Sequence, residues 1–386
     1  MTIPTFSELV NNVKSDLRNK LGVNSIIGKV FINAFSVVQG SKLKLFYLRS
    51  AQTYLNIFLD QCDDETIVRY GRVYLDRDPL PATAGEYKLS VTGEIGAVIA
   101  AGTTFKSRDT SLNPGQIFIT DDIFTFTTTT GIIDVRSLEL GIVSKLNIDD
   151  ELKSTQPLAD IDDIVIVQSV TTTPIESETI DEYRAKVKLA AQVEPQGGAR
   201  VDLVLWASDA QGERNFLPYV KSGEPSVVQG YVEANPADSV PVNTGIPTQT
   251  IIDNVEAVIN LDPDDTKAME DRGRRPMWLV MEYLPVVPLD VDIEITSLSD
   301  TSLLSSIKEA VRSFIFNIRP YLDGADNPND SQKGKLYPAD IIGIIRDTIG
   351  SATFSDVEIS VDGNVITTYY EFLGGNIPYI NNVTAV

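Results

Sequence analysis

The sequence contains no histidine and a single cysteine, Cys62. Without histidine, the chain has no Ser-His-Asp triad, no Cys-His pair, and no zinc or iron site that uses imidazole ligands. A lone cysteine forms neither an internal disulfide nor a CxxC redox pair. The glycine patterns of phosphate-binding and dinucleotide-binding loops are also missing. These absences exclude many enzyme classes, and we expect neither a catalytic residue, nor a cofactor, nor a metal that depends on these ligands.

Basic residues are also scarce, because 32 Lys and Arg stand against 54 Asp and Glu, for a net charge of −22. A strong polyanion repels nucleic acid and anionic membranes unless its cations gather in one place. Residues 1–75 are the exception, with nine basic and six acidic side chains. We therefore predict no nucleic-acid or membrane partner. The basic segment is either an arm that docks on acidic partners or a solvated helix face.

Long apolar runs are missing as well. No stretch reaches the roughly 18–20 apolar residues that a bilayer-spanning helix needs, and residues 1–20 lack the apolar centre of a signal peptide. We expect a soluble chain that is made in a cytoplasm.

The patterns that are present predict a multi-domain α+β fold in four parts. These are an N-terminal helical arm (1–78), a small β-sandwich or barrel (79–173), a central α+β domain (174–298) and a C-terminal α+β domain (299–386).

The N-terminal arm is predicted to contain a helix over residues 41–60. Its apolar side chains include Leu45, Leu48, Leu55 and Phe58, with further aromatic residues between them. They are too many for one narrow stripe, so the helix must be covered on more than one side. Other chains are the expected cover. A second helix is expected to open at Asp63–Glu65, and Gly71 and Pro79–Pro81 are expected to end this region.

In the second part, short β-rich runs are separated by glycines, as in a small sandwich or barrel. The acidic stretch 149–182 that overlaps its end is interpreted as an exposed face, with calcium binding as the alternative. In the third part, Thr179 and Glu182 form a capping box at the start of a helix. Later, Leu289 to Ile295 alternate with acidic residues, which predicts a strand with one buried face.

Three clusters could carry chemistry or binding. Among 54 acidic residues, a glycosidase-like carboxylate pair cannot be identified from sequence alone. The segment 323–330 is rich in oxygen ligands but lacks EF-hand spacing, so we interpret it as a polar loop. Arg272, Arg274 and Arg275 either clamp carboxylates of a neighbouring chain or lie in a solvated loop.

Several short runs, taken in order, resemble the baseplate J-like family, which comprises wedge proteins of contractile phage tails and related injection machines. The runs are Phe58–Asp64, Arg69–Arg72, Pro81–Gly85, Val91–Gly93, Val98–Thr103, Glu178–Arg184, Gly197–Gly198, Trp206, Arg275–Pro276, Val286–Pro288 and Asp290–Val291.

This resemblance implies a non-enzymatic wedge component that assembles in a six-fold ring around a hub and transmits the contraction signal. It implies that the N-terminal helices bind a second copy and another wedge protein, and that the C-terminal domain contacts the neighbouring wedge. Hub and sheath proteins would complete the contacts in the tail baseplate of a virion assembled in the host cytoplasm. The alternative is a virion-associated or secreted polysaccharide-acting hydrolase or glycan-binding protein, although only two tryptophans are available as sugar platforms.

Overall fold

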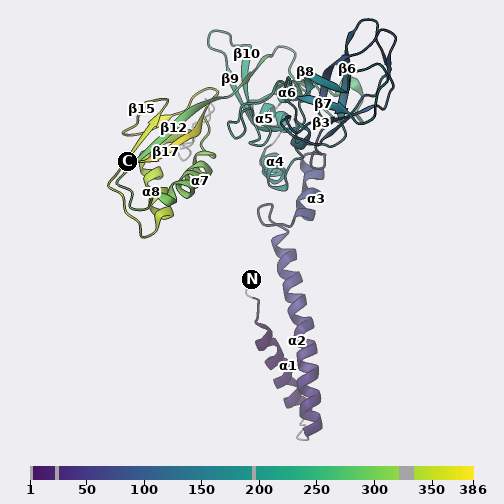
Figure 1. Cartoon of the computed structure of the whole chain (residues 1–386). Coiled ribbons are helices and arrows are strands. Elements are labelled where there is room, and N and C mark those ends of the chain that lie inside the picture. The colour runs from purple at the N-terminus through teal and green to yellow at the C-terminus, as the bar shows by residue number, and fades with distance from the viewer. Residues whose placement is uncertain (1–2, 22–25, 194–196, 321–333) are drawn as a thin grey trace. The chain divides into compact units, whose positions relative to one another are not determined.

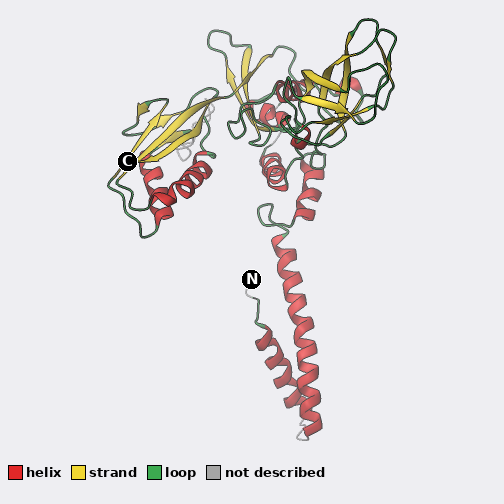
Figure 2. Cartoon of the chain, in the orientation of Figure 1, coloured by secondary structure: helices red, strands yellow, loops and turns green. Residues whose placement is uncertain are grey.

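The computed structural model describes residues 3–21, 26–193, 197–320 and 334–386. Figures 1 and 2 show helices together with several separate sheets, one of which closes into a barrel. This confirms the predicted multi-domain α+β fold. The chain divides into a first unit, Met1–Pro79 with Thr179–Gln192, and a second unit, Leu80–Glu178 with Val193–Val386.

The first unit is helical. It contains α1 (Phe6–Leu21), α2 (Ile26–Leu55), α3 (Asp64–Tyr74) and α4 (Ile180–Gln192). The helix predicted over residues 41–60 corresponds to the second half of α2. The observed helix begins before the predicted one, at Ile26, and ends before it, at Leu55. The sequence suggested that Gly71 helps to end this region. In the structure, α3 instead continues through Gly71 to Tyr74.

A small core joins α3 to α4. Cys62 and Ile67 pack with Tyr183 and Val187, and all four side chains are buried. Cys62 is therefore a core residue. The predicted boundary at residue 173 assigned α4 to the central domain, whereas the structure packs α4 against α3.

The predicted capping box opens α4. The Thr179 N–H donates to Glu182 Oε2 at 2.8 Å, and the Glu182 N–H donates to Thr179 Oγ1 at 3.3 Å. Each side chain thus satisfies a backbone group that the first helical turn leaves unpaired.

The second unit begins with a closed barrel. The sequence left a sandwich and a barrel open, and the structure has the barrel. Its strand order is β1-β6-β4-β3-β7-β8. The strands are β1 (Glu86–Thr92), β3 (Thr104–Ser107), β4 (Ile117–Ile119), β6 (Thr130–Ser137), β7 (Glu151–Ser154) and β8 (Ile164–Thr172), and the short pair β2 (Val98–Ile99) and β5 (Phe124–Thr125) lies beside them. Alternate residues of each strand point inward, so the barrel interior is a packed core.

The acidic stretch 149–182 does not form one continuous face, because it contains β7, β8 and the start of α4. Several of its carboxylates hold backbone groups. Asp150 accepts the Asn147 N–H at 2.8 Å, and Glu176 accepts the Ile142 N–H at 3.0 Å. In the described parts of the chain, no three acidic or cysteine side chains are grouped as a metal site would require.

A three-stranded sheet follows the barrel, in the order β11-β10-β9. Its strands are β9 (Glu213–Val220), β10 (Val227–Ala234) and β11 (Val280–Pro285), and the helices α5 (Arg200–Ala207) and α6 (Gln249–Asn260) pack with it. Ile251 and Val255 of α6 are fully buried against the sheet.

The C-terminal part is a four-stranded sheet, β15-β14-β12-β17, packed with two helices. The elements are β12 (Val287–Thr296), α7 (Leu304–Ile315), α8 (Pro338–Ile349), β14 (Asp356–Val361), β15 (Asn364–Val365) and β17 (Asn376–Ala385), with the small pair β13 (Lys335–Leu336) and β16 (Tyr370–Glu371).

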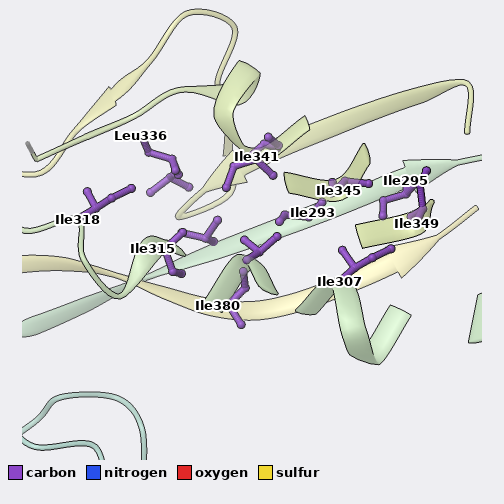
Figure 3. Close-up of a cluster of buried hydrophobic side chains, with 14 of the residues drawn as sticks. Ile293, Ile295, Ile307, Ile315, Ile318, Leu336, Ile341, Ile345, Ile349 and Ile380 are labelled. Atoms are coloured by element: carbon purple, nitrogen blue, oxygen red, sulfur yellow. The ribbon is translucent and has the colours of Figure 1, made fainter. Parts of the chain in front are cut away.

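Figure 3 shows the core between this sheet and its helices. Ile293 and Ile295 of β12 point into it with Ile307 of α7 and with Ile341 and Ile345 of α8. The predicted alternation along β12 is therefore confirmed. The candidate oxygen-ligand loop, 323–330, lies outside the described residues.

Candidate interaction surfaces

The first candidate surface lies on the α1–α2 hairpin. Helix α1 runs antiparallel along the first half of α2, as Figure 1 shows, and Lys44 Nζ donates to the Pro4 carbonyl at 2.8 Å. The α2 face toward α1 carries Ile32, Ser36 and Gly40, which are buried and spaced by four residues. A Cβ on Gly40 would lie 2.6 Å from Cγ2 of Val10, so glycine permits the close approach of the two helices.

The rest of α2 leaves large apolar side chains in solvent. Leu45 is 66% exposed and Phe46 is 70% exposed. The exposed large apolar residues of α2 are Val30, Phe31, Phe35, Val37, Val38, Leu43, Leu45, Phe46, Leu48 and Tyr54. They surround the helix, and a helix that is apolar on all sides is normally covered by other structure.

The residues predicted from the sequence fall on this surface or next to it. Leu45 and Leu48 are exposed on α2, and Leu55 at its end is half-buried. Phe58 follows the helix, is exposed, and packs edge-on against Tyr54 at 5.3 Å between ring centroids. Their role as an interface stays a prediction. Among the described helices, none combines the length and apolar content needed to cross a bilayer.

The second candidate surface is the loop between α6 and β11, where the three arginines have different environments. Arg274 pairs with Asp209 at 2.8 Å and with Asp262 at 3.2 Å, and its side chain is 16% exposed. Arg272 donates to the Asp262 carbonyl at 2.7 Å. Arg275 is exposed and donates to the Leu279 carbonyl at 3.0 Å. Of the three, Arg275 has the greatest freedom to meet another chain.

The ion pair with Arg274 also affects the pKa of Asp262. Burial opposes ionisation of Asp262, but the bond from the Asp264 N–H and the ion pairs with Lys267 and Arg274 outweigh it. The pKa of Asp262 is therefore lowered from its usual value, and the loop is fixed by internal charge pairing.

We predict that Arg274→Glu destabilises the second unit by roughly 3 kcal/mol, because it places a third carboxylate beside Asp209 and Asp262 and removes the arginine that both of them contact. Arg275→Glu is the matched control and should cost less than about 1 kcal/mol, because that side chain is exposed. Urea unfolding followed by tryptophan fluorescence measures both. Equal losses would contradict the internal role of Arg274.

Sequence reasoning missed the two residues that follow the arginines. Met277 is fully exposed at 104% and Trp278 is 67% exposed. They stand in a loop, where no periodicity identifies an apolar surface. The one available signal was two large apolar residues that follow a basic cluster after a single proline. Trp206, the other tryptophan, packs partly buried against the core under the three-stranded sheet.

No protein-family model matches the chain. No curated protein matches it. Among solved structures, the chain is similar to one in the cryo-EM structure of the anti-feeding prophage (AFP) baseplate, 6-fold symmetrised, with a TM-score of 0.44 and 8% sequence identity over 96% of this chain and 90% of that chain.

Proposed function

We propose that this chain is a structural, non-enzymatic component of a contractile-tail baseplate, and that the α1–α2 hairpin joins it to other chains. In this proposal the chain is a wedge protein whose hairpin binds a second copy and another wedge protein. Its C-terminal domain contacts the neighbouring wedge, which closes a ring around the hub. The baseplate assignment comes from the ordered sequence runs that resemble the baseplate J-like family.

The observation that carries the proposal is the exposed apolar surface of α2. Complete burial of one leucine or phenylalanine side chain contributes about 1.5–3 kcal/mol. Covering even part of the set around Leu45 and Phe46 would therefore favour association strongly. The residues 1–75 carry a small positive charge in a strongly acidic chain, so acidic partners suit this arm.

We predict that a triple variant, Leu45→Ser, Phe46→Ser and Leu48→Ser, folds but enters tail particles at least about tenfold less than the wild type, because a few apolar anchors carry most of the energy of an interface. The measurement is the amount of the chain in tail particles sedimented from producing cells.

The matched control changes three exposed polar residues of the same helix, Asn33→Ser, Lys42→Ser and Arg49→Ser. It should enter particles as the wild type does. Circular dichroism confirms that both variants keep their helices. If the apolar triple variant is incorporated normally, the hairpin is not the joining element.

A further inference from the structure

The second unit contains two sheets with separate cores, which meet at a narrow joint. The three-stranded sheet and its helices form the central part, residues 197–286, and the four-stranded sheet and its helices form the C-terminal part, residues 287–386. The buried core of the C-terminal part (Figure 3) takes its members from residues 291–380, and the core of the central part takes its members from residues 175–283. Each part can therefore keep its fold while the joint between them changes.

The chain passes from the central part to the C-terminal part at Val286, which lies between β11 and β12. The Val286 N–H donates to the Val232 carbonyl of the central part at 3.1 Å, and the Val287 N–H donates to the Gly375 carbonyl of the C-terminal part at 2.8 Å. Adjacent residues thus belong to different sheets. Because the connection is this short, a movement between the parts is a rotation about one point, which is the geometry of a hinge.

The apolar packing at this joint is small. Leu217 of β9, Val286 and Ile377 of β17 form its buried cluster, with Tyr219 and Tyr231 partly buried against it. A hollow of about 30 Å³ adjoins Ile377, residues of both parts line it, and it has room for a water molecule. Parts of a chain move relative to one another unless a large apolar interface fixes them. Apolar contact alone therefore does not fix the orientation of the C-terminal part.

A buried charge cluster spans the same joint. Arg319 of the C-terminal part donates to both carboxylate oxygens of Glu233 on the central part, through Nε at 2.7 Å and through Nη2 at 2.5 Å. In the other direction, Arg214 of the central part donates to the Phe316 carbonyl at 2.9 Å. Nη1 of Arg319 also donates to the Ile318 carbonyl at 2.7 Å. The guanidinium is thus held at the end of α7, and it meets Glu233 in a fixed direction.

We propose that this joint is a latched hinge: the C-terminal part swings about Val286 as a rigid body, and the two-point contact of Glu233 with Arg319 holds it in one orientation. A carboxylate bound by both arms of a guanidinium fixes direction as well as distance, whereas apolar contact is non-directional. Opening the latch separates a buried ion pair, so the open orientation is a minor state of the wild type. The proposal does not depend on the α1–α2 hairpin or on the baseplate assignment.

Spin-label distances in the full chain test the proposal. In a Cys62→Ala background, labels are attached at Ser222→Cys in the central part and at Ser306→Cys in the C-terminal part, both at exposed positions. Pulsed electron spin resonance gives the distribution of distances between the parts. We expect one narrow distance with the latch intact. In Glu233→Gln and in Arg319→Gln, a second distance should appear, with the open population raised at least about tenfold.

Asn215→Ala is the matched control. Asn215 donates to the same Glu233 carboxylate at 2.7 Å, but both residues belong to the central part, so this bond does not cross the joint. The variant should keep the wild-type distance between the parts. A second pair of labels, at the exposed positions Ser306 and Asn364, lies entirely within the C-terminal part and should give the same distance in every variant.

Arg319→Lys is a milder variant, which keeps the test valid if loss of the pair unfolds the chain. Lysine keeps the positive charge but cannot make the two-point contact, so the distance between the parts should broaden while the fold is kept. Unchanged distances between the parts in Arg319→Lys and Glu233→Gln would overturn the proposal. Equal broadening of the distance within the C-terminal part would also overturn it, because this would show local unfolding instead of a swing.

Discussion

Glu233→Ala is expected to destabilise the second unit by about 3–5 kcal/mol, the usual cost of removing one partner from a buried ion pair. Glu233 on β10 is 1% exposed, and it lies between Arg214 of β9 and Arg319, which follows α7. Arg319 donates to its carboxylate through Nε at 2.7 Å and through Nη2 at 2.5 Å, Arg214 Nη1 donates at 2.8 Å, and Asn215 adds a fourth bond at 2.7 Å. The alanine variant would remove the carboxylate that these two largely buried arginines share.

The same cluster ties the three-stranded sheet to the end of α7. The Arg214 guanidinium lies 3.1 Å from the ring centroid of Phe316, and its Nη2 donates to the Phe316 carbonyl at 2.9 Å. We therefore expect Glu233→Ala to release residues 316–319 as well. Urea unfolding measures the free energy, and hydrogen exchange of these residues measures the release.

The matched control is Glu282→Ala. Glu282 pairs with Lys221 at 2.7 Å on the same sheet, but its side chain is 36% exposed. Exposed pairs contribute about 0–1 kcal/mol. A loss at Glu233 no larger than the loss at Glu282 would contradict the role of the buried cluster.

The pKa of Glu233 adds a pH dependence to this prediction. Burial opposes its ionisation, but the bonds and charges of Arg319, Arg214 and Asn215 outweigh burial and lower the pKa below the usual 4.5. The carboxylate therefore contributes stability above pH 4.5, and this is lost as the pH falls through the lower folded-state pKa. In Glu233→Gln, the unfolding free energy should fall less steeply with acid than in the wild type.

Gly71→Ala is expected to destabilise the packing of α3 on α4 by roughly 1–3 kcal/mol, because it overfills a closed core. A Cβ at this position would lie 1.8 Å from Oη and 2.3 Å from Cζ of Tyr183. The Tyr183 ring is fully buried and its hydroxyl donates to the Arg77 carbonyl, so the ring has no free space to move into.

Gly343→Ala in α8 is the control for this substitution. No atom lies within 4 Å of the Cβ that it would add, and alanine favours a helix over glycine by about 0.5–1 kcal/mol. It should be neutral or stabilising. Thermal unfolding compares the stability of the two variants. A similar change in stability for both would show that the Tyr183 ring does not block a side chain at position 71.

Local patterns predicted the elements that sequence periodicity encodes. The alternation at Leu289–Ile295 predicted β12, whose Ile293 and Ile295 are buried. The periodicity of an amphipathic helix shows which of its faces is buried, but not which other element covers that face. For that reason the sequence did not reveal that α4 packs on α3, with Val187 against Ile67, 120 positions apart in the printed sequence.

The interaction surfaces were predictable to different degrees. The excess of apolar residues in α2 is visible in the sequence because a helix has room for one buried stripe. The environment of Arg274 depends on Asp209 and Asp262, which only the fold brings together. Glu233 likewise gave no sequence signal, since a buried carboxylate is indistinguishable from the many exposed ones until its arginines are located.

Cryo-electron microscopy of tail particles purified with the tagged full chain tests the central claim most directly. We predict that the chain lies in the baseplate and that helices of other chains cover α2, with Leu45 and Phe46 buried between them. Recovery of the tagged chain without tail particles, or a chain whose α2 remains in solvent, would contradict the claim.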